Sequence, residues 1–325
     1  MFRRVKLAAG VSAALMCAGV AGSACAQNYP ARTIRLILPF PPGGPSDLLG
    51  RPLAQRLGEQ MGVQVVVDNR PGAGGNIGLE LAAKAPPDGY TLVQGASAMT
   101  ISPALYARLN YDPQKDLAPI SLAAVVHNVL LVHPSVPARS LKELIELARS
   151  RPGKLNYGSG GVGVTSHLAP ELLQSLTGIK MVHVPFKGVG LAVIGLVSGE
   201  VDILVMGAPA AAGHAEAGKV RPLAVLSDTR APALPKVPTA REAGVENFAV
   251  DLWYGVLAPA GTPSGIVNRL NGEIHKALGA PDIRQKLSAA GIEPKLSTPE
   301  QFASFIRSET VRYAKVIRDA GIKLE

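Results

Sequence analysis

The glycine-rich stretch Pro39-Phe-Pro-Pro-Gly-Gly-Pro-Ser-Asp47 has the composition of a site that binds an anion without a charged side chain. An apolar run from Ile34 to Leu38 precedes it and predicts a strand, which the prolines cannot continue. Its last two residues stand where a following helix would be capped. Glycine tolerates positive φ and a helix start leaves N–H groups unpaired, so Gly43 and Gly44 predict a pocket of backbone donors. A purely structural strand-to-helix turn is the alternative interpretation.

Two more segments could add donors to such a site, because each follows an expected strand in the same way. The run Val63-Gln-Val-Val-Val67 leads into Asn69-Arg-Pro-Gly-Ala-Gly-Gly-Asn76, whose glycines include Gly74. A third strand leads into Gly95-Ala-Ser-Ala98, which contributes Ser97. Strands that alternate with helices predict an α/β sheet, and the ligands of such sheets bind at the carboxyl ends of the strands. The three turns are therefore expected side by side if their strands are parallel neighbours.

The same pattern begins again in the second half of the chain, which indicates a second domain. A helix expected at Ser140 to Arg149 and a short strand at Leu155 to Tyr157 precede Gly158-Ser-Gly-Gly-Val-Gly-Val-Thr-Ser-His167. A later strand ends in Pro185-Phe-Lys-Gly188, where Lys187 is interpreted either as a ligand contact or as a solvated surface residue. These turns also supply hydroxyl donors, which suit an anion held by neutral dipoles: Ser97, Ser159, Thr165 and Ser166.

The N-terminus predicts a cleaved secretory signal peptide covering residues 1–26, and hence an exported protein. Basic residues precede the apolar run from Leu7 to Val20, and Ala24-Cys25-Ala26 forms a small-x-small cleavage site. The run is too short, and its flank too polar, for the alternative of a membrane-spanning helix. Both cysteines lie in this segment, so the mature chain is expected to have no disulfide and no cysteine nucleophile or ligand.

Composition and charge argue for a two-domain protein and against nucleic-acid recognition. The 325-residue chain is 47% hydrophobic, which is enough apolar material for two cores. Removing the leader, with its three basic residues, lowers the formal net charge from +9 to +6. Lysine and arginine are scattered and only 4% of residues are aromatic, so no nucleic-acid interface is expected. The remaining charge favours small anions or reflects a solvated surface.

Three patterns could indicate an enzyme, a cofactor or a metal, but each lacks a neighbouring residue or a spacing that it requires. Gly158-Ser-Gly-Gly-Val-Gly163 has the spacing of a dinucleotide loop, but no acidic residue ends the next strand, Met181 to Val184. A serine-hydrolase elbow needs glycine two residues before the serine, and Tyr157 occupies that position before Ser159. The histidines show no metal-ligand spacing, so each is interpreted as a packed or surface residue. No cofactor, metal or catalytic residue is expected.

The turns described above occur in a fixed order, with Asp88-Gly-Tyr-Thr-Leu92 between them, and two further segments follow. These are Pro235-Lys-Val-Pro-Thr-Ala-Arg-Glu-Ala-Gly244 and Trp253-Tyr-Gly-Val-Leu-Ala-Pro-Ala-Gly-Thr-Pro263. As an ordered set that covers essentially the whole mature chain, they resemble the Bug family, the extracytoplasmic solute receptors of tripartite tricarboxylate transporters. Each glycine motif alone is unspecific, and the set is what carries the resemblance.

The resemblance implies a type II periplasmic binding protein, in which two α/β domains surround a ligand cleft and are joined by two hinge crossings. We place the crossings near Ala124 and Val250, so residues 27–124 and 251–325 form the first domain and residues 125–250 the second. The family holds a carboxylate mainly with the first turn, and the second domain closes over it. Asp47 is expected to cap its own helix, because it would repel a carboxylate. The candidate ligand-binding residues are Phe40, Pro41, Gly43, Gly44, Ser46, Asp47, Gly74, Ser97, Ser159, Gly163, Thr165, Ser166, His167, Phe186 and Lys187.

Three residues depart from the family pattern, and all three bear on the ligand. Phe186 stands where tyrosine is common, Gly207 where an acidic residue often follows the strand, and Ser46 where threonine is usual. The lost hydroxyl and carboxylate favour a ligand with an aliphatic or aromatic body.

The expected function is that of a monomeric periplasmic receptor that captures a small carboxylate by hinge closure. The ligand classes compatible with the sequence are di- and tricarboxylates, amino acids and aromatic acids. The receptor would deliver its ligand to the membrane subunits of a tripartite tricarboxylate transporter. An exported enzyme acting on small carboxylic acids, or a ligand-dependent partner of a sensor protein, remains the alternative.

Overall fold

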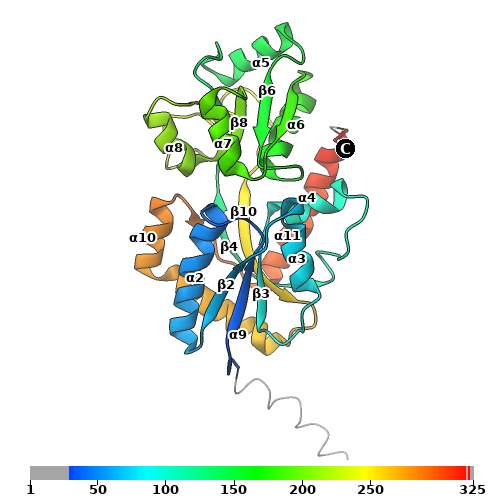
Figure 1. Ribbon diagram of the computed structural model, residues 1–325, viewed down its shortest axis with the longest axis vertical. Coiled ribbons are helices and arrows are strands. Elements are labelled where there is room, and N and C mark those ends of the chain that lie inside the picture. Colours follow the sequence, from blue (N-terminus) through cyan, green and yellow to red (C-terminus); the bar gives the residue numbers. More distant parts are fainter. Residues whose placement is uncertain (1–28, 320, 323–325) are drawn as a thin grey trace, which may run out of the picture.

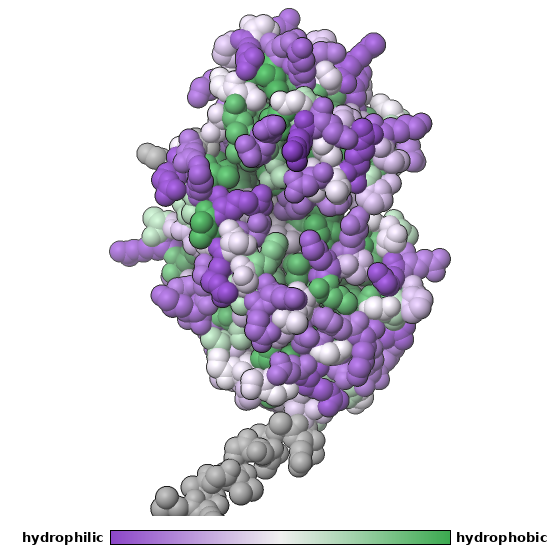
Figure 2. Space-filling view, turned by 180° about the vertical axis from the view of Figure 1, so that it is seen from behind, coloured by the Kyte–Doolittle hydropathy of each residue, from purple (hydrophilic) through white to green (hydrophobic). Residues whose placement is uncertain are grey.

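The computed structural model describes residues 29–319, 321 and 322, so the expected signal peptide lies outside the described residues. The described chain forms two lobes, each built on one sheet, that are stacked along the long axis of the molecule (Figure 1). Seen from behind, polar residues cover most of both lobes, and apolar residues show around the level where the lobes meet (Figure 2). Among the described helices, none combines the length and the apolar character needed to cross a membrane.

Lobe 1 contains a six-stranded mixed sheet in the order β11-β4-β10-β3-β1-β2. Its strands are β1 (Ile34–Leu38), β2 (Val65–Asn69), β3 (Thr91–Ala96), β4 (Leu117–Val126), β10 (Leu252–Pro259) and β11 (Glu293–Pro294). Its helices are α2 (Pro45–Met61), α3 (Asn76–Ala83), α4 (Ser97–Leu105), α9 (Ser264–Gly279), α10 (Pro281–Ala289) and α11 (Pro299–Asp319), with a 3-10 turn η1 (Ala73–Gly75) before α3. β1 pairs in parallel with both β2 and β3, which confirms that the first three strands are neighbours. The turns after them therefore lie at one edge of the sheet.

Lobe 2 contains a five-stranded mixed sheet in the order β7-β6-β8-β5-β9. Its strands are β5 (Asn128–Val132), β6 (Asn156–Ser159), β7 (Val182–Pro185), β8 (Ile203–Gly207) and β9 (Arg221–Val225). Its helices are α5 (Leu141–Ser150), α6 (Thr165–Thr177), α7 (Val189–Ser198) and α8 (Ala208–Glu216). β6 pairs in parallel with β7 and β8, so the turns after β6 and β7 also share an edge.

Each sheet is covered on both faces, and the alternation of side chains along a strand produces two core layers per lobe. On β5, Leu130 and Val132 belong to the layer shared with α5 and α6, whereas Val129 and Leu131 belong to the layer shared with α7 and α8. Burial on both faces explains why this strand reads as an uninterrupted apolar run. The resulting rigid sheets position the turns at their edges.

The chain passes between the lobes at two places, which lie next to each other. His127 separates β4 from β5, and Asp251 precedes β10; the Nδ1 atom of His127 lies 3.1 Å from Oδ1 of Asp251. The side-chain amide of Asn128 also donates to the carbonyl of Val250 at 2.8 Å. These contacts tie the two crossings together.

Helix α11 is a third connection, because its two ends pack in different lobes. Phe302 and Ile306 lie in a core layer of lobe 1, whereas Tyr313 and Ile317 lie in a core layer of lobe 2. Figure 1 shows α11 rising from the lower lobe to the side of the upper one. The division at residues 124 and 250 stays a prediction, and the packing of α11 belongs to both lobes.

Candidate functional site

The turn between β1 and α2 needs glycine at only one of its two central positions. Gly43 has φ +83°, a left-handed conformation that favours glycine, and a Cβ atom placed there would have no neighbour within 4 Å. Gly44 has φ −84° and ψ 176°, which any residue adopts. The expectation that both glycines are required for the turn geometry is therefore corrected to Gly43 alone.

The helix start is also built differently from the predicted capping by Ser46 and Asp47. Gly44 is the N-cap of α2, no side chain caps that end, and Ser46 lies within the first helical turn. The buried hydroxyl of Ser46 instead hydrogen-bonds the side-chain carbonyl of Gln94 on β3. Ser46 thereby fastens α2 to the sheet.

Asp47 holds the first turn together rather than pointing a free carboxylate at the site. Its Oδ2 atom accepts hydrogen bonds from the N–H of Gly43 at 3.2 Å and from Nε of Arg51 at 2.8 Å. Its Oδ1 atom accepts from the amide of Asn69 at 3.2 Å. Burial alone would raise the pKa of Asp47, but the hydrogen bonds from Arg51, Gly43 and Asn69 outweigh it and hold the pKa below the ordinary value. Asp47 is thus a charged support for the turn.

The second turn of lobe 1 reaches lobe 2, whereas the third turn reaches the hinge. A Cβ atom placed on Gly74 would lie 3.4 Å from the carbonyl oxygen of Val162 in lobe 2 and 3.6 Å from the hydroxyl of Tyr106. Ser97 is fully buried; its Oγ atom donates to the carbonyl of Asp251 at 3.2 Å and accepts from the N–H of Trp253 at 3.0 Å. The Ser97 hydroxyl is therefore used by the second crossing, and its ligand contact stays a prediction.

The corresponding turn of lobe 2, after β6, is held by neutral side chains. The Oγ atom of Ser159 accepts from the N–H of Gly161 at 3.1 Å, donates to the Gly161 carbonyl at 3.0 Å and lies 2.6 Å from Nε2 of His183. The N–H of Gly160 donates to Oγ of Ser166 at 3.0 Å. A longer contact of 3.4 Å joins the N–H of Gly163 to Nδ1 of His167. Three glycine N–H groups of this turn are thus paired within the protein.

Backbone donors that could face an anion lie at the two helix starts, those of α2 and α6. The N–H groups of Gly44 and Ser46 at α2, and of Thr165 and Ser166 at α6, make no hydrogen bond to the described part of the chain. Helix starts leave such donors unpaired, and the helix dipole adds a partial positive charge there. Both starts can therefore donate to a carboxylate without any charged side chain.

The remaining candidates line the same region at its margins. The ring of Phe40 lies against the second turn, where a Cβ on Gly75 would be 3.3 Å from its Cζ atom. The ring of Phe186 packs under α7, where a Cβ on Gly195 would be 2.7 Å away. Pro41 is exposed, and its Cγ atom lies 3.9 Å from a Cβ atom placed on Gly188 of lobe 2. Lys187, the residue before Gly188, is also exposed. The first turn and the turn after β7 thus approach one another across the lobe boundary.

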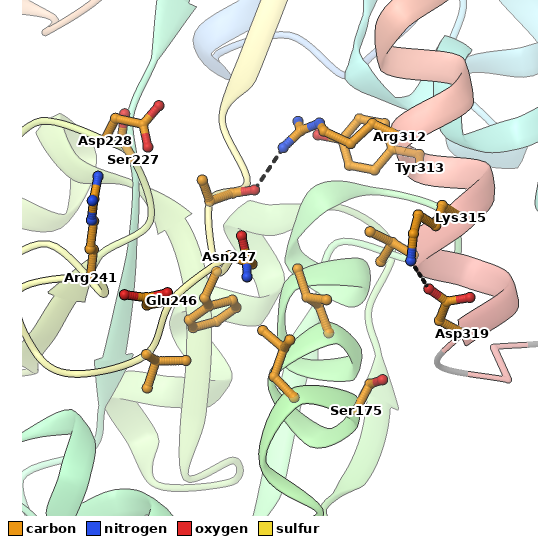
Figure 3. A pocket seen from close by; sticks show the side chains of 16 residues that line it. Ser175, Ser227, Asp228, Arg241, Glu246, Asn247, Arg312, Tyr313, Lys315 and Asp319 are labelled. Carbon is orange, nitrogen blue, oxygen red and sulfur yellow. Dashed lines mark hydrogen bonds and ion pairs between the residues drawn. The ribbon is translucent and has the colours of Figure 1, made fainter.

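A cavity of about 740 Å³ lies elsewhere, between α6, α11 and the loop before the second crossing (Figure 3). Nη1 of Arg312 donates to the carbonyl of Ala249 at 2.9 Å on one side of it, and Lys315 pairs with Asp319 on α11. Its lining balances three basic side chains, Arg241, Arg312 and Lys315, against three acidic ones, Asp228, Glu246 and Asp319. Balanced charge gives this cavity no preference for an anion. Within the described residues there is also no group of three or more histidine, aspartate or glutamate side chains placed to hold a metal ion.

Comparison with known proteins decides what kind of molecule carries these turns. Residues 49–322 match the family model described as the tripartite tricarboxylate transporter family receptor, TctC. The chain belongs to the tripartite tricarboxylate transporter receptor family. Members of this family are binding proteins rather than enzymes, and the Bug proteins are among them.

Solved structures of family members share the fold along the whole described chain. The Rhodopseudomonas palustris protein Rpa4515, solved with adipate, has 38% identity and a TM-score of 0.85, covering 91% of this chain and all of that one. The periplasmic binding protein BugD has 31% identity and a TM-score of 0.84, with coverage of 91% and 100%. MatC from Rhodopseudomonas palustris, with bound malate, has 33% identity and a TM-score of 0.83, with coverage of 89% and 100%. The two α/β lobes of this receptor are therefore those of a periplasmic binding protein.

Sequence reasoning missed the side chains that hold the turns in shape. His183 was interpreted as a lone packed or surface residue, yet it contacts Ser159 from the neighbouring strand. Gln94 and Asn69 similarly anchor Ser46 and Asp47. The signal for His183 lies in the strand register, which pairs it with Tyr157, two residues before Ser159. That register becomes visible only once β6 and β7 are known to be parallel neighbours.

Proposed function

We propose that this receptor captures a small dicarboxylate between its two lobes and delivers it to the membrane subunits of a tripartite tricarboxylate transporter. The observation that carries the proposal is the pair of helix starts, α2 and α6, whose first N–H donors have no partner among the described residues. The turns of the two lobes approach each other nearby, through Pro41 and Gly188 and through Gly74 and Val162. Two relatives were solved with the dicarboxylates adipate and malate. A ligand with two carboxylates matches two separate sets of donors, one in each lobe. Ligand contacts from both lobes would favour the closed arrangement and so couple capture to docking.

The ligand preference follows from what surrounds the donors. At the start of α2 the nearby Arg51 is engaged by Asp47. The ring of Phe186 is partly buried and packs under α7, where a tyrosine hydroxyl would add polarity. Gly207 supplies no side chain, and a Cβ atom placed there would lie 2.9 Å from Cγ1 of Val126 at the first crossing. An aliphatic dicarboxylate such as adipate fits this setting better than citrate, whose third carboxylate and hydroxyl would need further donors.

The experiment is native mass spectrometry of the purified mature protein, followed by calorimetric titration with adipate, malate, citrate and benzoate. We expect a one-to-one complex with a dicarboxylate, recovered unchanged after incubation. Failure of all four acids to bind would overturn the proposal, and chemical conversion of a bound acid would favour the exported enzyme. Co-purification with the transporter's membrane subunits only in the presence of the bound acid tests delivery, and retention by a sensor protein instead would favour the sensory role.

A further inference from the structure

The imidazole of His183 is clamped behind the turn of lobe 2 by aromatic neighbours on both faces. Its ring stacks on Tyr157 at a centroid distance of 4.9 Å and on His167 at 4.3 Å. The register of β6 and β7 places Tyr157 directly opposite His183. The edge of this fixed ring presents Nε2 to the hydroxyl of Ser159 at 2.6 Å. The ring cannot turn away without repacking both stacks.

The hydrogen-bond partners of Ser159 determine which nitrogen of His183 carries the proton. A hydroxyl has a single proton, and the carbonyl of Gly161, 3.0 Å away, can only accept it. The same hydroxyl accepts the N–H of Gly161. All three contacts of the hydroxyl are satisfied at once if Nε2 of His183 is the donor toward Ser159. This arrangement favours the Nε2–H tautomer with an unprotonated Nδ1.

The surroundings keep this imidazole neutral. Burial, together with the neighbouring His167, lowers the pKa of His183 to about 4, although Glu171 acts in the opposite direction. Glu171 is itself engaged by the hydroxyl of Tyr157. Burial likewise lowers the pKa of His167 to about 4. At neutral pH the stack therefore carries no positive charge of its own.

We propose that His183 is a positioning residue of the carboxylate site: its Nε2–H holds the Ser159 hydroxyl on Gly161 and so fixes the turn that leads into α6. The inference rests on the proposed function and adds to it. The N–H groups of Gly160, Gly161 and Gly163 are paired within the turn. We infer that the turn contributes to binding by aiming the N–H groups of Thr165 and Ser166, which have no partner among the described residues. If the turn were free to move, the N–H groups of Thr165 and Ser166 would point toward the ligand for a smaller fraction of the time. The affinity for the carboxylate would then fall.

Two substitutions separate the donor from the ring. His183→Phe keeps the aromatic stacks and removes the donor, whereas His183→Gln loses the stacks but restores an N–H near the position of Nε2. We expect His183→Phe to weaken binding of adipate, or of malate if adipate does not bind, at least tenfold by calorimetry. We expect His183→Gln to stay within threefold of the wild type. His133→Phe is the matched control. Nδ1 of His133 lies 2.7 Å from the hydroxyl of Ser135, outside the site, so the affinity of this variant should equal that of the wild type.

A double-mutant cycle tests whether His183 acts through Ser159. In a Ser159→Ala background, His183→Phe should change affinity less than twofold, because the contact is already gone. Equal losses in both backgrounds, or unchanged affinity of His183→Phe in the wild-type background, would overturn the inference.

The tautomer gives a readout that needs no ligand. A long-range ¹H–¹⁵N spectrum at pH 7, assigned by the signals that disappear in His183→Gln, should show a protonated Nε2 and a bare Nδ1. A protonated Nδ1 would overturn the inference. A wild-type protein that shows this tautomer and binds no carboxylate would contradict the proposed function and leave the turn geometry standing.

Discussion

Two helix starts offer the same kind of backbone donors, but the turns before them are held by opposite chemistry. In lobe 1 a charged carboxylate, Asp47, ties Gly43 and Asn69 together and is balanced by Arg51. In lobe 2 uncharged hydroxyl and imidazole groups pair the glycine N–H groups. Neither turn places an unbalanced charge beside its donors. A carboxylate would thus be held by dipoles alone, an interaction weak enough for release to a transporter.

The side chains that hold the two turns keep their charge states over a common range of pH. A lowered pKa for Asp47 means that its support is present at neutral pH and is lost only as the pH falls below the ordinary carboxyl range. His167 and His183 have pKa values near 4, so they stay neutral until the pH approaches 4. Both turns therefore keep their shape across mildly acidic and neutral conditions.

Removing the charged support should have the largest effect. We expect Asp47→Ala to lower the free energy of unfolding by about 2 to 3 kcal/mol, because the buried carboxylate of Asp47 no longer accepts from Gly43, Asn69 and Arg51. Urea denaturation measures this, with Asp47→Asn as the control that keeps one oxygen acceptor. An Asp47→Ala variant as stable as the wild type would show that the carboxylate does not hold the turn.

A single donor on the neutral side should matter for affinity rather than for stability. The side chain of Thr165 at the start of α6 is mostly buried and its hydroxyl makes no hydrogen bond to the described residues, so Thr165→Val should weaken dicarboxylate binding by about 1 to 3 kcal/mol. Calorimetric titration measures the change. Thr177→Val, at the other end of α6, is the control because its hydroxyl already donates to Leu173. Unchanged affinity of Thr165→Val would remove this hydroxyl from the ligand contacts.

The first turn itself can be tested by comparing two adjacent glycines. Gly43→Ala should lower stability by about 1 to 2 kcal/mol, because alanine is strained at the positive φ of Gly43. Gly44→Ala should be nearly neutral, since its backbone is extended and a Cβ there would meet only the carbonyl of Pro41 at 3.9 Å. Thermal unfolding of the two variants measures the difference. Equal effects would mean that the turn relaxes to accept a side chain.

Local patterns predicted the strand-turn-helix units closely, because hydrophobic runs and glycine turns act over short distances. The strand at Ile34 to Leu38 has the predicted bounds, and the helix expected at Ser140 to Arg149 is α5, Leu141–Ser150, with Ser140 as its N-cap. β4 was missed, because Pro119 and the alanines beside it read as a loop. Its pairing with β10, where Pro119 lies opposite Leu257, supplies the missing information. α4 was missed for a similar reason, since Ser97 and the small residues before it resemble a turn.

The site was harder to predict than the fold, because its geometry depends on contacts between distant segments. The glycine N–H groups expected to face a ligand are partly used by Asp47 and Ser166. A sequence shows which residues can donate, but it does not show which donors are already paired. The resemblance to a receptor family pointed to these turns, and that they bind the ligand stays a prediction. Only the folded chain separates the supports of the turns from their unpaired donors.

Substitution of a third histidine, His127 at the hinge, should have the smallest effect on stability. His127 favours its charged form, in contrast to His167 and His183, which favour the neutral form. Its hydrogen bond with Asp251 raises its pKa, and the nearby Glu293 adds to the shift, although burial opposes it. A pKa raised above that of the unfolded chain gives stability that is complete below the unfolded value and is lost as the pH rises through the folded one. The buried histidines of lobe 2 have the opposite sign, so the protein becomes less stable through them as the pH falls below about 6.5.

We therefore expect His127→Gln to lower the free energy of unfolding by about 1 kcal/mol at pH 6 and by less at pH 8.5, where His127 has lost its proton. The effect is small because the ion pair with Asp251 is partly exposed. Urea denaturation at both pH values measures it, and taking the difference from the wild type cancels the contribution of His167 and His183. His214→Gln, near the end of α8 and away from the hinge, is the control for the substitution itself. A cost that grows toward pH 8.5 would mean that His127 is neutral in the folded protein. The hinge would then be joined by an ordinary hydrogen bond, and the hinge, like lobe 2, would rely on an uncharged imidazole.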